Sequence, residues 1–391
     1  MKKLALILIF IVINLCAQDS KLDLKFFGTL GAVYNNNSDY KFRENPFQKD
    51  GASNSLDIYT DSILGVQSTY KLNDDLSFIF QGIAKKEYDG ENKASIDWGY
   101  LKYDSKENFI FKLGKIRIPY YKNSNNQNIG YSKLTIREPI EVYGQVPLST
   151  YNGIEFIYSN MINKYFYSIQ SIYGETTFDT PLYSNNGDVL RTKIKEVRSL
   201  NLTLGNDIIE GRATYLYGRS STTSNSLEEL FTGLRIANLD ELADKYEMDN
   251  KVSQYYSLGM FIDYNDFIFS SEYGERQVNA FYANLHGFYA SLGYRFLSFI
   301  PYISYAQVEM DEQTVVDTGV DGLNELLKVQ NLAQNSTNIG FKYYINENFD
   351  LKFEYQRIQP KGVYGGFYID STNEYPNSRL DIYSFVIDFV F

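Results

Sequence analysis

The sequence LDIYSFVIDFVF, residues 380–391, has a two-residue periodicity in its side chains. Every second position from 383 onward is apolar: Tyr383, Phe385, Ile387, Phe389 and Phe391. The alternate positions between them include Ser384, Val386 and Asp388. Because successive side chains of a strand point to opposite faces of its sheet, the stretch predicts a strand with one apolar and one polar face.

Two classes of protein use such a strand. A soluble protein would place the aromatic face on its core, whereas a transmembrane barrel would place it against lipid and turn the carboxylate into the lumen. The barrel is favoured because the rest of the chain repeats the pattern. An alternating final strand that ends in Phe also resembles the C-terminal signature of bacterial outer-membrane proteins. This resemblance implies that the five apolar residues are read by the barrel assembly machinery.

The first seventeen residues have the pattern of a secretory signal peptide. A basic start at Lys2 and Lys3 is followed by an apolar run at 4–13, which is too short to span a bilayer. Cleavage is expected after Ala17, which removes Cys16, the only cysteine of the chain. The mature domain, residues 18–391, is therefore expected to lie in the outer membrane of a Gram-negative bacterium without disulfides.

The composition favours one membrane-embedded domain. The 391 residues include 36 Tyr and 27 Phe but only 8 Pro, and no segment has the composition of a linker. Beyond the signal, no apolar run is long enough for a membrane helix, so insertion into lipid would have to use strands. The formal net charge of −11 disfavours a nucleic-acid partner, which would require a basic face.

Alternating segments of about ten to thirteen residues, the length that a tilted barrel strand needs, recur from Leu24 onward. The sixteen predicted strands lie near 24–34, 56–70, 75–86, 93–104, 107–118, 151–160, 164–175, 194–204, 207–219, 252–264, 266–277, 286–296, 298–309, 335–346, 348–359 and 380–391. Seven short turns and eight longer loops alternate between them. The pattern predicts an all-β, antiparallel transmembrane barrel with short periplasmic turns and long extracellular loops.

Charged residues occupy one face of several predicted strands, as Lys352 and Glu354 do. Since a cation that faces lipid at the bilayer centre costs about 2–4 kcal/mol, these faces are expected to line a hydrated lumen. The strand at 107–118 departs from the pattern, because its apolar face continues into Lys115 and Arg117. Arg117 is predicted to reach the outer rim, and Lys115 either faces a neighbouring protomer or marks a change of register.

Two of the predicted outer loops contain helical patterns, at 227–248 and 322–333. The first has a leucine-rich stripe opposite a run of acidic residues. Such segments form either a cap with ligand contacts at the outer mouth or solvated amphipathic helices packed on the rim, and the second interpretation is favoured.

The loop at about 119–150 is the most informative internal stretch. Loops longer than about twelve to fifteen residues are usually functional or disordered, and the apolar content of this one favours order. Four segments in and around it, LGKIRIP (113–119), IGY (129–131), REPIEVY (137–143) and YNG (151–153), resemble the strand-loop-strand of trimeric sixteen-stranded porins. The porins in question are those similar to the phosphate-selective porins O and P and the DcaP-like porins.

This resemblance implies a passive, water-filled channel, a homotrimer in which the loop folds inward and narrows the lumen. It also implies a preference for small anions, although lumen carboxylates such as Glu155, Glu210 and Glu272 oppose strict anion selectivity. The candidate constriction residues are Lys122, Lys133, Arg137, Glu138 and Glu141 on the loop and Lys112, Arg212, Arg295, Lys352 and Glu354 on the wall. These residues either create a transverse field that screens solutes by charge or form ion pairs that fix the loop to the wall.

No pattern in the sequence predicts an enzyme or a cofactor. His286 is the sole histidine, so neither a His/Cys metal cluster nor a supported Ser-His site is expected, and no phosphate-binding glycine pattern occurs. The chain is interpreted as an outer-membrane porin through which small hydrophilic solutes and ions diffuse. The main alternative is a non-conducting barrel that acts in adhesion or surface recognition. An enzyme barrel or a gated transporter is disfavoured, because neither a catalytic arrangement nor a plug before Leu24 is found.

Overall fold

The computed structural model describes residues 21–38, 40–45, 48–87, 89–105, 107–146, 148–181, 189–311, 317–330, 332–361, 366–370 and 379–391. The expected signal peptide, residues 1–17, lies outside the described residues.

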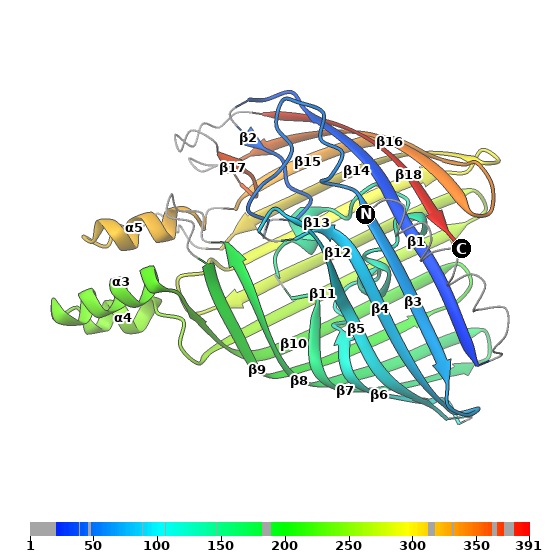
Figure 1. Cartoon of the computed structure of the whole chain (residues 1–391), viewed down its shortest axis with the longest axis horizontal. Helices are drawn as coiled ribbons and strands as arrows, with labels where there is room; N and C mark the ends of the chain where they lie inside the picture. The colour runs from blue at the N-terminus through cyan, green and yellow to red at the C-terminus, as the bar shows by residue number, and fades with distance from the viewer. Residues whose placement is uncertain are drawn as a thin grey trace.

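Sixteen strands in the described part of the chain form one closed antiparallel barrel (Figure 1). They are β1 (Leu22–Asn35), β3 (Ile63–Lys71), β4 (Leu76–Lys86), β5 (Asn92–Asp104), β6 (Phe109–Arg117), β7 (Thr150–Ile162), β8 (Tyr165–Pro181), β9 (Val189–Gly205), β10 (Ile209–Thr223), β11 (Lys251–Tyr264), β12 (Phe267–Val278), β13 (Leu285–Tyr294), β14 (Phe299–Met310), β15 (Gln334–Tyr344), β16 (Phe349–Pro360) and β18 (Leu380–Val390). Each strand pairs with its sequence neighbours, and β1 pairs with β18 to close the ring. The predicted number and order of strands are confirmed.

Side-chain burial in the barrel is inverted relative to a soluble protein. Along β18, Ser384 and Asp388 are buried toward the lumen, whereas Tyr383 and Phe385 are 43% and 41% exposed on the outer surface. Leu258 on β11 is likewise 61% exposed. Apolar side chains outside and polar ones inside are the arrangement that a lipid environment requires. All five residues of the expected assembly signal lie on the outer face of this final strand or directly after it, and their role in assembly stays a prediction.

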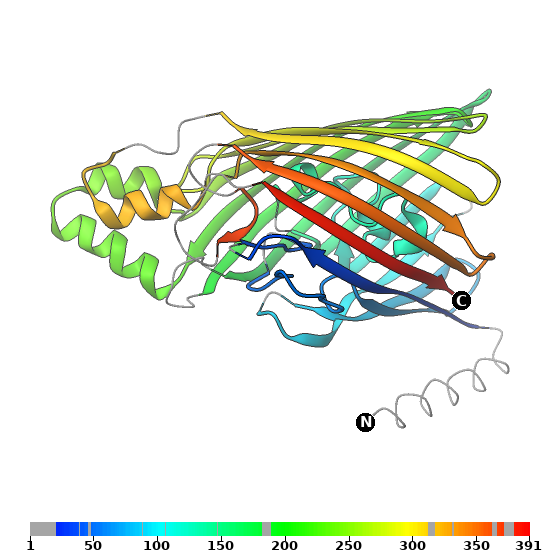
Figure 2. The same cartoon turned by 90° about the horizontal axis from the view of Figure 1, so that it is seen from above.

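The short turns lie at the same end of the barrel as the start of β1 and the end of β18, opposite the helices (Figure 2). Asn108, Asn163 and Asn265 in these turns have positive φ, a backbone conformation that asparagine tolerates better than most residues. Short turns thus connect the barrel strands at this end.

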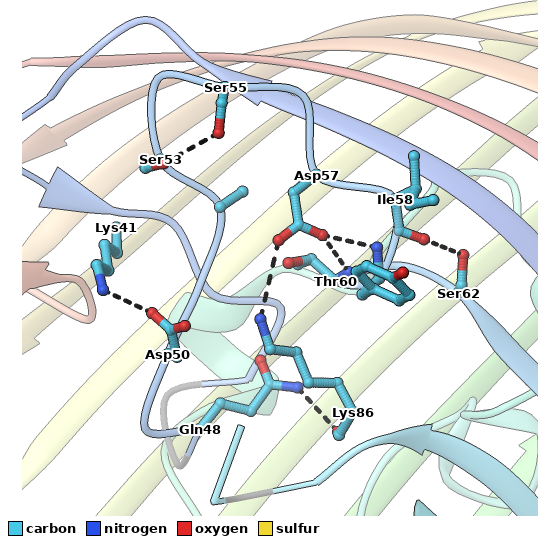
Figure 3. A network of polar contacts seen from close by, with 12 residues as sticks. Lys41, Gln48, Asp50, Ser53, Ser55, Asp57, Ile58, Thr60, Ser62 and Lys86 are labelled. Atoms are coloured by element: carbon cyan, nitrogen blue, oxygen red, sulfur yellow. Dashed lines mark hydrogen bonds and ion pairs between the residues drawn. The ribbon is translucent and has the colours of Figure 1, made fainter. Parts of the chain in front are cut away.

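The second barrel strand starts later than predicted. β3 begins at Ile63 rather than at residue 56, because residues 56–62 fold as turns and bends around Asp57. One Asp57 oxygen accepts the backbone N–H groups two and three positions later, at 2.7 and 2.8 Å, as Figure 3 shows. The other oxygen lies 3.8 Å from the Lys86 ammonium. The prediction of a strand from residue 56 is therefore wrong, and the segment belongs to the loop after β1.

β8 and β9 are longer than predicted. Residues 176–181 pair with 189–194, so the hairpin of β8 and β9 extends beyond Thr150, the first residue of β7. The loop predicted at 176–193 is therefore mostly strand.

The departure from alternation in β6 is not a change of register, because Phe109 to Arg117 pair with β7 without a shift. The nearby irregularity lies in the pairing of β4 with β5, which skips Asp97. Gly114 has a φ of +145°, and Lys115 after it donates to the Ile96 carbonyl at 2.7 Å. Arg117 is buried and forms an ion pair with Asp97 of β5. The expectation that Arg117 reaches the outer rim is wrong, because its side chain is buried in this ion pair.

Three helices extend beyond the strand ends at the long-loop side (Figure 2). They are α3 (Asn225–Ile236), α4 (Asp240–Tyr246) and α5 (Asp321–Lys328). Both predicted helical segments are confirmed, and the first is broken at Asn238, which has a φ of 59°. Leu227, Phe231, Leu234, Leu323, Leu326 and Leu327 form one apolar cluster, so the two segments pack together. Within the described residues, no helix has the length and apolarity needed to cross a membrane.

Candidate channel constriction

The segment between β6 and β7, residues 118–149, lies inside the ring of strands (Figures 1 and 2) and is called the inner loop below. It contains η1 (Ser124–Asn126), η2 (Gly130–Ser132) and α2 (Ile140–Tyr143). η2 packs against β1 and β18, and α2 packs against β12, β13 and β14. The inner loop therefore contacts two separate parts of the lumen wall.

Apolar burial explains why the inner loop is ordered. Its buried apolar residues are Ile118, Tyr120, Tyr121, Val142, Val146 and Leu148. They join wall residues such as Ile172, Val197 and Leu216 in one cluster inside the barrel. Removal of this apolar surface from water supplies the driving force that a polar loop would lack.

On the β10–β12 side, the inner loop is held by Glu272. The Glu272 carboxylate accepts the backbone N–H of Lys122 at 2.9 Å and the hydroxyls of Tyr143 and Tyr289 at 2.6 and 2.9 Å. Burial, together with this carboxylate, raises the pKa of Tyr143 well above its usual range. Beside it, the Lys122 ammonium pairs with Glu210 at 2.5 Å.

Farther around the ring, on β15 and β16, two lysines bind the backbone of the inner loop. Lys342 donates to the carbonyls of residues 131 and 133, at 2.5 and 3.2 Å, and pairs with Asp350 at 3.0 Å. Lys352 donates to the Gly130 carbonyl at 2.7 Å and pairs with Asp388 at 2.9 Å. We call these four charged residues the lysine clamp. A Cβ at position 130 would lie 2.0 Å from Asp388 Oδ1, so only glycine allows this close approach.

A third attachment joins the inner loop to the loop after β1. Arg137 forms a bidentate ion pair with Asp61, with Nε 2.6 Å from Oδ1, and donates to the Ser384 hydroxyl at 2.8 Å. Glu141, fully buried, accepts from Gln334 at 2.7 Å. Burial raises the pKa of Glu141.

A cavity of about 530 Å³, called the vestibule below, lies between the inner loop and the outer parts of β4, β5 and β8. Of the ten candidate constriction residues, Lys133, Arg137 and Glu138 line it. Glu138 accepts from the side-chain amide of Asn123 at 2.8 Å. Burial raises the pKa of Glu138, and the nearby Lys133 opposes this shift.

The other candidate wall residues make structural contacts. Lys112 pairs with Glu155 at 2.6 Å, Arg212 donates to the Pro119 carbonyl at 2.7 Å, and Glu354 accepts from the Tyr302 hydroxyl at 2.7 Å. Arg295 lies in the turn between β13 and β14, where it pairs with Asp263. The structure does not bring Arg295 to the inner loop, and the roles of all ten residues in solute passage stay predictions.

Sequence reasoning missed several charged groups that hold the site together. Asp61 was missed because residues 56–70 have the pattern of a strand. Asp97, the partner of Arg117, was missed because it lies at an irregularity in the pairing of β4 with β5. Lys342 was recognisable, since it lies on the inward face of the strand before Lys352 and is its direct register partner.

No protein-family model and no curated protein sequence matches the chain. Among solved structures, the outer-membrane channel DcaP of Acinetobacter baumannii is similar, with a TM-score of 0.57 and 13% identity over 95% of this chain and 97% of that one. OmpT of Vibrio cholerae has a TM-score of 0.55 and 12% identity over 96% and 99% of the two chains. An anion-selective porin from Comamonas acidovorans has a TM-score of 0.54 and 11% identity over 95% and 100%. At these identities the likeness concerns the fold, and the chain therefore has the fold of the sixteen-stranded outer-membrane porins.

Proposed function

We propose that this chain forms a water-filled channel in the outer membrane, through which small hydrophilic solutes and ions diffuse passively. The observation that carries the proposal is a closed barrel, apolar outside and charged inside, whose lumen holds an ordered inner loop beside a 530 Å³ vestibule. Export through a signal peptide cleaved near residue 17 belongs to the same proposal.

The charges of the vestibule support weak selectivity at neutral pH. Several of its charged residues are neutralised by an ion pair, such as Arg117 with Asp97 and Arg137 with Asp61. Within the described residues, the lining cations without a carboxylate within 4.0 Å are Lys85, Lys115 and Lys133. The lining carboxylates without a cation within that distance are Glu44, Glu87 and Glu138. Three charges of each sign favour neither anions nor cations strongly.

The test is single-channel conductance of the purified, folded protein in a planar bilayer, with the reversal potential measured under a salt gradient. We expect stable open steps and a small reversal potential at neutral pH. One similar structure is described as the trimer form of Vibrio cholerae OmpT, and a trimeric assembly of this chain would give steps in groups of three. Absence of conductance from folded protein would contradict the channel.

Adhesion or surface recognition is the second candidate. Two observations favour it: the helices α3, α4 and α5 project beyond the barrel, and the inner loop is attached to the lumen wall at several strands. Folded protein that inserts into the bilayer but never conducts would support this function. Its folded state would be checked by the different gel mobilities of unheated and heated samples.

A further inference from the structure

A second cavity, of about 80 Å³, lies in the lumen between the end of the inner loop and the outer halves of β8 to β12. Its wall is largely apolar and includes Leu148, Phe178, Ile194, Val197, Leu216 and Val278. We call it the apolar cavity. It adjoins the vestibule, because Val146, Leu148 and Phe178 line both. A solute in the vestibule would thus meet charged groups on one side and an apolar recess on the other.

Arg276 of β12 is the one charged residue among the described residues that line the apolar cavity. It is 8% exposed and donates to the carbonyls of Gln145 and Ala283, at 2.6 and 2.8 Å. Its Nε has no hydrogen-bond acceptor, and no carboxylate of the described residues lies within 4.0 Å of the guanidinium. Carbonyl dipoles stabilise a buried cation but leave its charge uncompensated, which is costly.

Two other buried arginines of the lumen are neutralised differently. Arg117 and Arg137, also buried, each form an ion pair with an aspartate. The small polar groups around the apolar cavity bond to one another, as Ser253 does with Ser220 at 2.8 Å. Arg276 is therefore the group to which an entering anion would bind.

We propose that the apolar cavity and Arg276 form a subsite for a short aliphatic monocarboxylate. The carboxylate would neutralise Arg276 through charge-assisted hydrogen bonds, and the chain would leave water against the apolar wall. The small cavity restricts the occupant to a short chain. This inference rests on the proposed channel function and deepens it, because a weak site beside the vestibule would concentrate such solutes without trapping them.

Hexanoate is a suitable probe. 1-Hexanol is the control that keeps the chain but lacks the charge, and acetate is the control that keeps the carboxylate but lacks the chain. Binding to the detergent-folded protein would be measured by NMR line broadening of the probe, which does not require conduction. Interruption of the ion current by hexanoate would be recorded separately in the bilayer. We expect hexanoate to bind at least about tenfold more tightly than either control compound, because 1-hexanol cannot pair with Arg276 and acetate cannot fill the apolar cavity.

Two variants separate the charge from the cavity. Arg276→Gln should weaken hexanoate binding about tenfold and leave 1-hexanol unchanged, since one charge-assisted interaction is lost. Val197→Phe, which fills the cavity, should weaken both probes. The matched control is Arg43→Gln, because Arg43 is equally buried and also donates to loop carbonyls but does not line the cavity. Hexanoate binding should persist in this control.

The inference is overturned if 1-hexanol binds as tightly as hexanoate, or if folded Arg276→Gln keeps its affinity for hexanoate. Unchanged binding in folded Val197→Phe would also exclude the apolar cavity. A channel that conducts but does not bind hexanoate would refute the subsite alone. Hexanoate binding by a protein that never conducts would refute the channel and leave the subsite standing.

Discussion

At the scale of single residues, the ion pair between Arg137 and Asp61 is the contact that joins two loops inside the barrel. Both side chains are nearly fully buried, so Asp61→Asn would leave a buried guanidinium without its countercharge. We expect this change to lower the free energy of unfolding by about 3–5 kcal/mol, as measured by urea titration in lipid vesicles.

The matched control for this change is Asp263→Asn. Asp263, near the end of β11, also forms a bidentate pair, with Arg295 of the turn after β13, but this pair is exposed. Its loss should cost about 0–1 kcal/mol, because water replaces the partner of an exposed charge. Equal effects of the two substitutions would contradict the structural role of the buried pair.

The raised pKa of Glu138 leads to a prediction of how ion selectivity changes with pH. Burial raises the pKa of this carboxyl above its ordinary value of 4.5, so it loses its negative charge at a higher pH than an ordinary glutamate. The vestibule then becomes more positive as pH falls. As pH falls from neutral, we therefore expect the reversal potential to shift toward anion selectivity, at a higher pH than the titration of an ordinary glutamate would give.

Glu138→Gln should show the anion-shifted reversal potential already at neutral pH and should lose most of the pH dependence. Glu141→Gln is the matched control. Burial also raises the pKa of Glu141, but its carboxylate accepts from Gln334 and it does not line the vestibule. If the pH dependence of the reversal potential persists in Glu138→Gln and disappears in Glu141→Gln, Glu138 is not the residue that causes it.

At the scale of elements, the inner loop and the helical cap contribute to different parts of the molecule. The inner loop is attached to the wall by Glu272 on one side and by the lysine clamp on the other. The helices α3 and α4 instead pack with α5 beyond the strand ends. The two elements can therefore be altered separately.

We expect replacement of residues 225–246 by a short flexible linker to leave the barrel folded, because the strand pairing does not involve α3 or α4. Single-channel conductance should change by less than about twofold, since these helices lie outside the lumen. Deletion of residues 120–146 should instead raise the conductance, because it removes the segment that occupies the lumen. Loss of conductance on removal of the helices would show that they form part of the pore.

At the scale of the whole molecule, the barrel is stable only if its outer surface meets lipid and its strands satisfy one another's backbone groups. Leu258 lies in the middle of β11 and is 61% exposed, whereas Tyr264 ends the same strand and is 52% exposed. Leu258→Arg should cost about 2–4 kcal/mol of unfolding free energy in lipid vesicles, and Tyr264→Arg about 0–1 kcal/mol. Similar costs at the two positions would contradict the transmembrane placement of β11.

Most of the fold was predictable from the sequence for a local reason. A strand alternates its faces every residue, so the apolar and polar sets of residues 380–391 reveal their environments without knowledge of any partner. The lengths of the connections then determine strand direction and loop side. Boundaries were less predictable, as β3 shows, because the side chain of Asp57 converts an alternating segment into turns.

By itself, the sequence determined the sixteen strands, their inward and outward faces and the position of a long ordered loop after the fifth barrel strand, since periodicity and loop length are local properties. The tertiary structure decided which charges meet. Arg137 and Asp61 are 76 residues apart, and Lys352 binds both Asp388 and the Gly130 carbonyl. Such contacts depend on where the inner loop crosses the lumen, and that path follows from apolar packing between segments distant in the sequence.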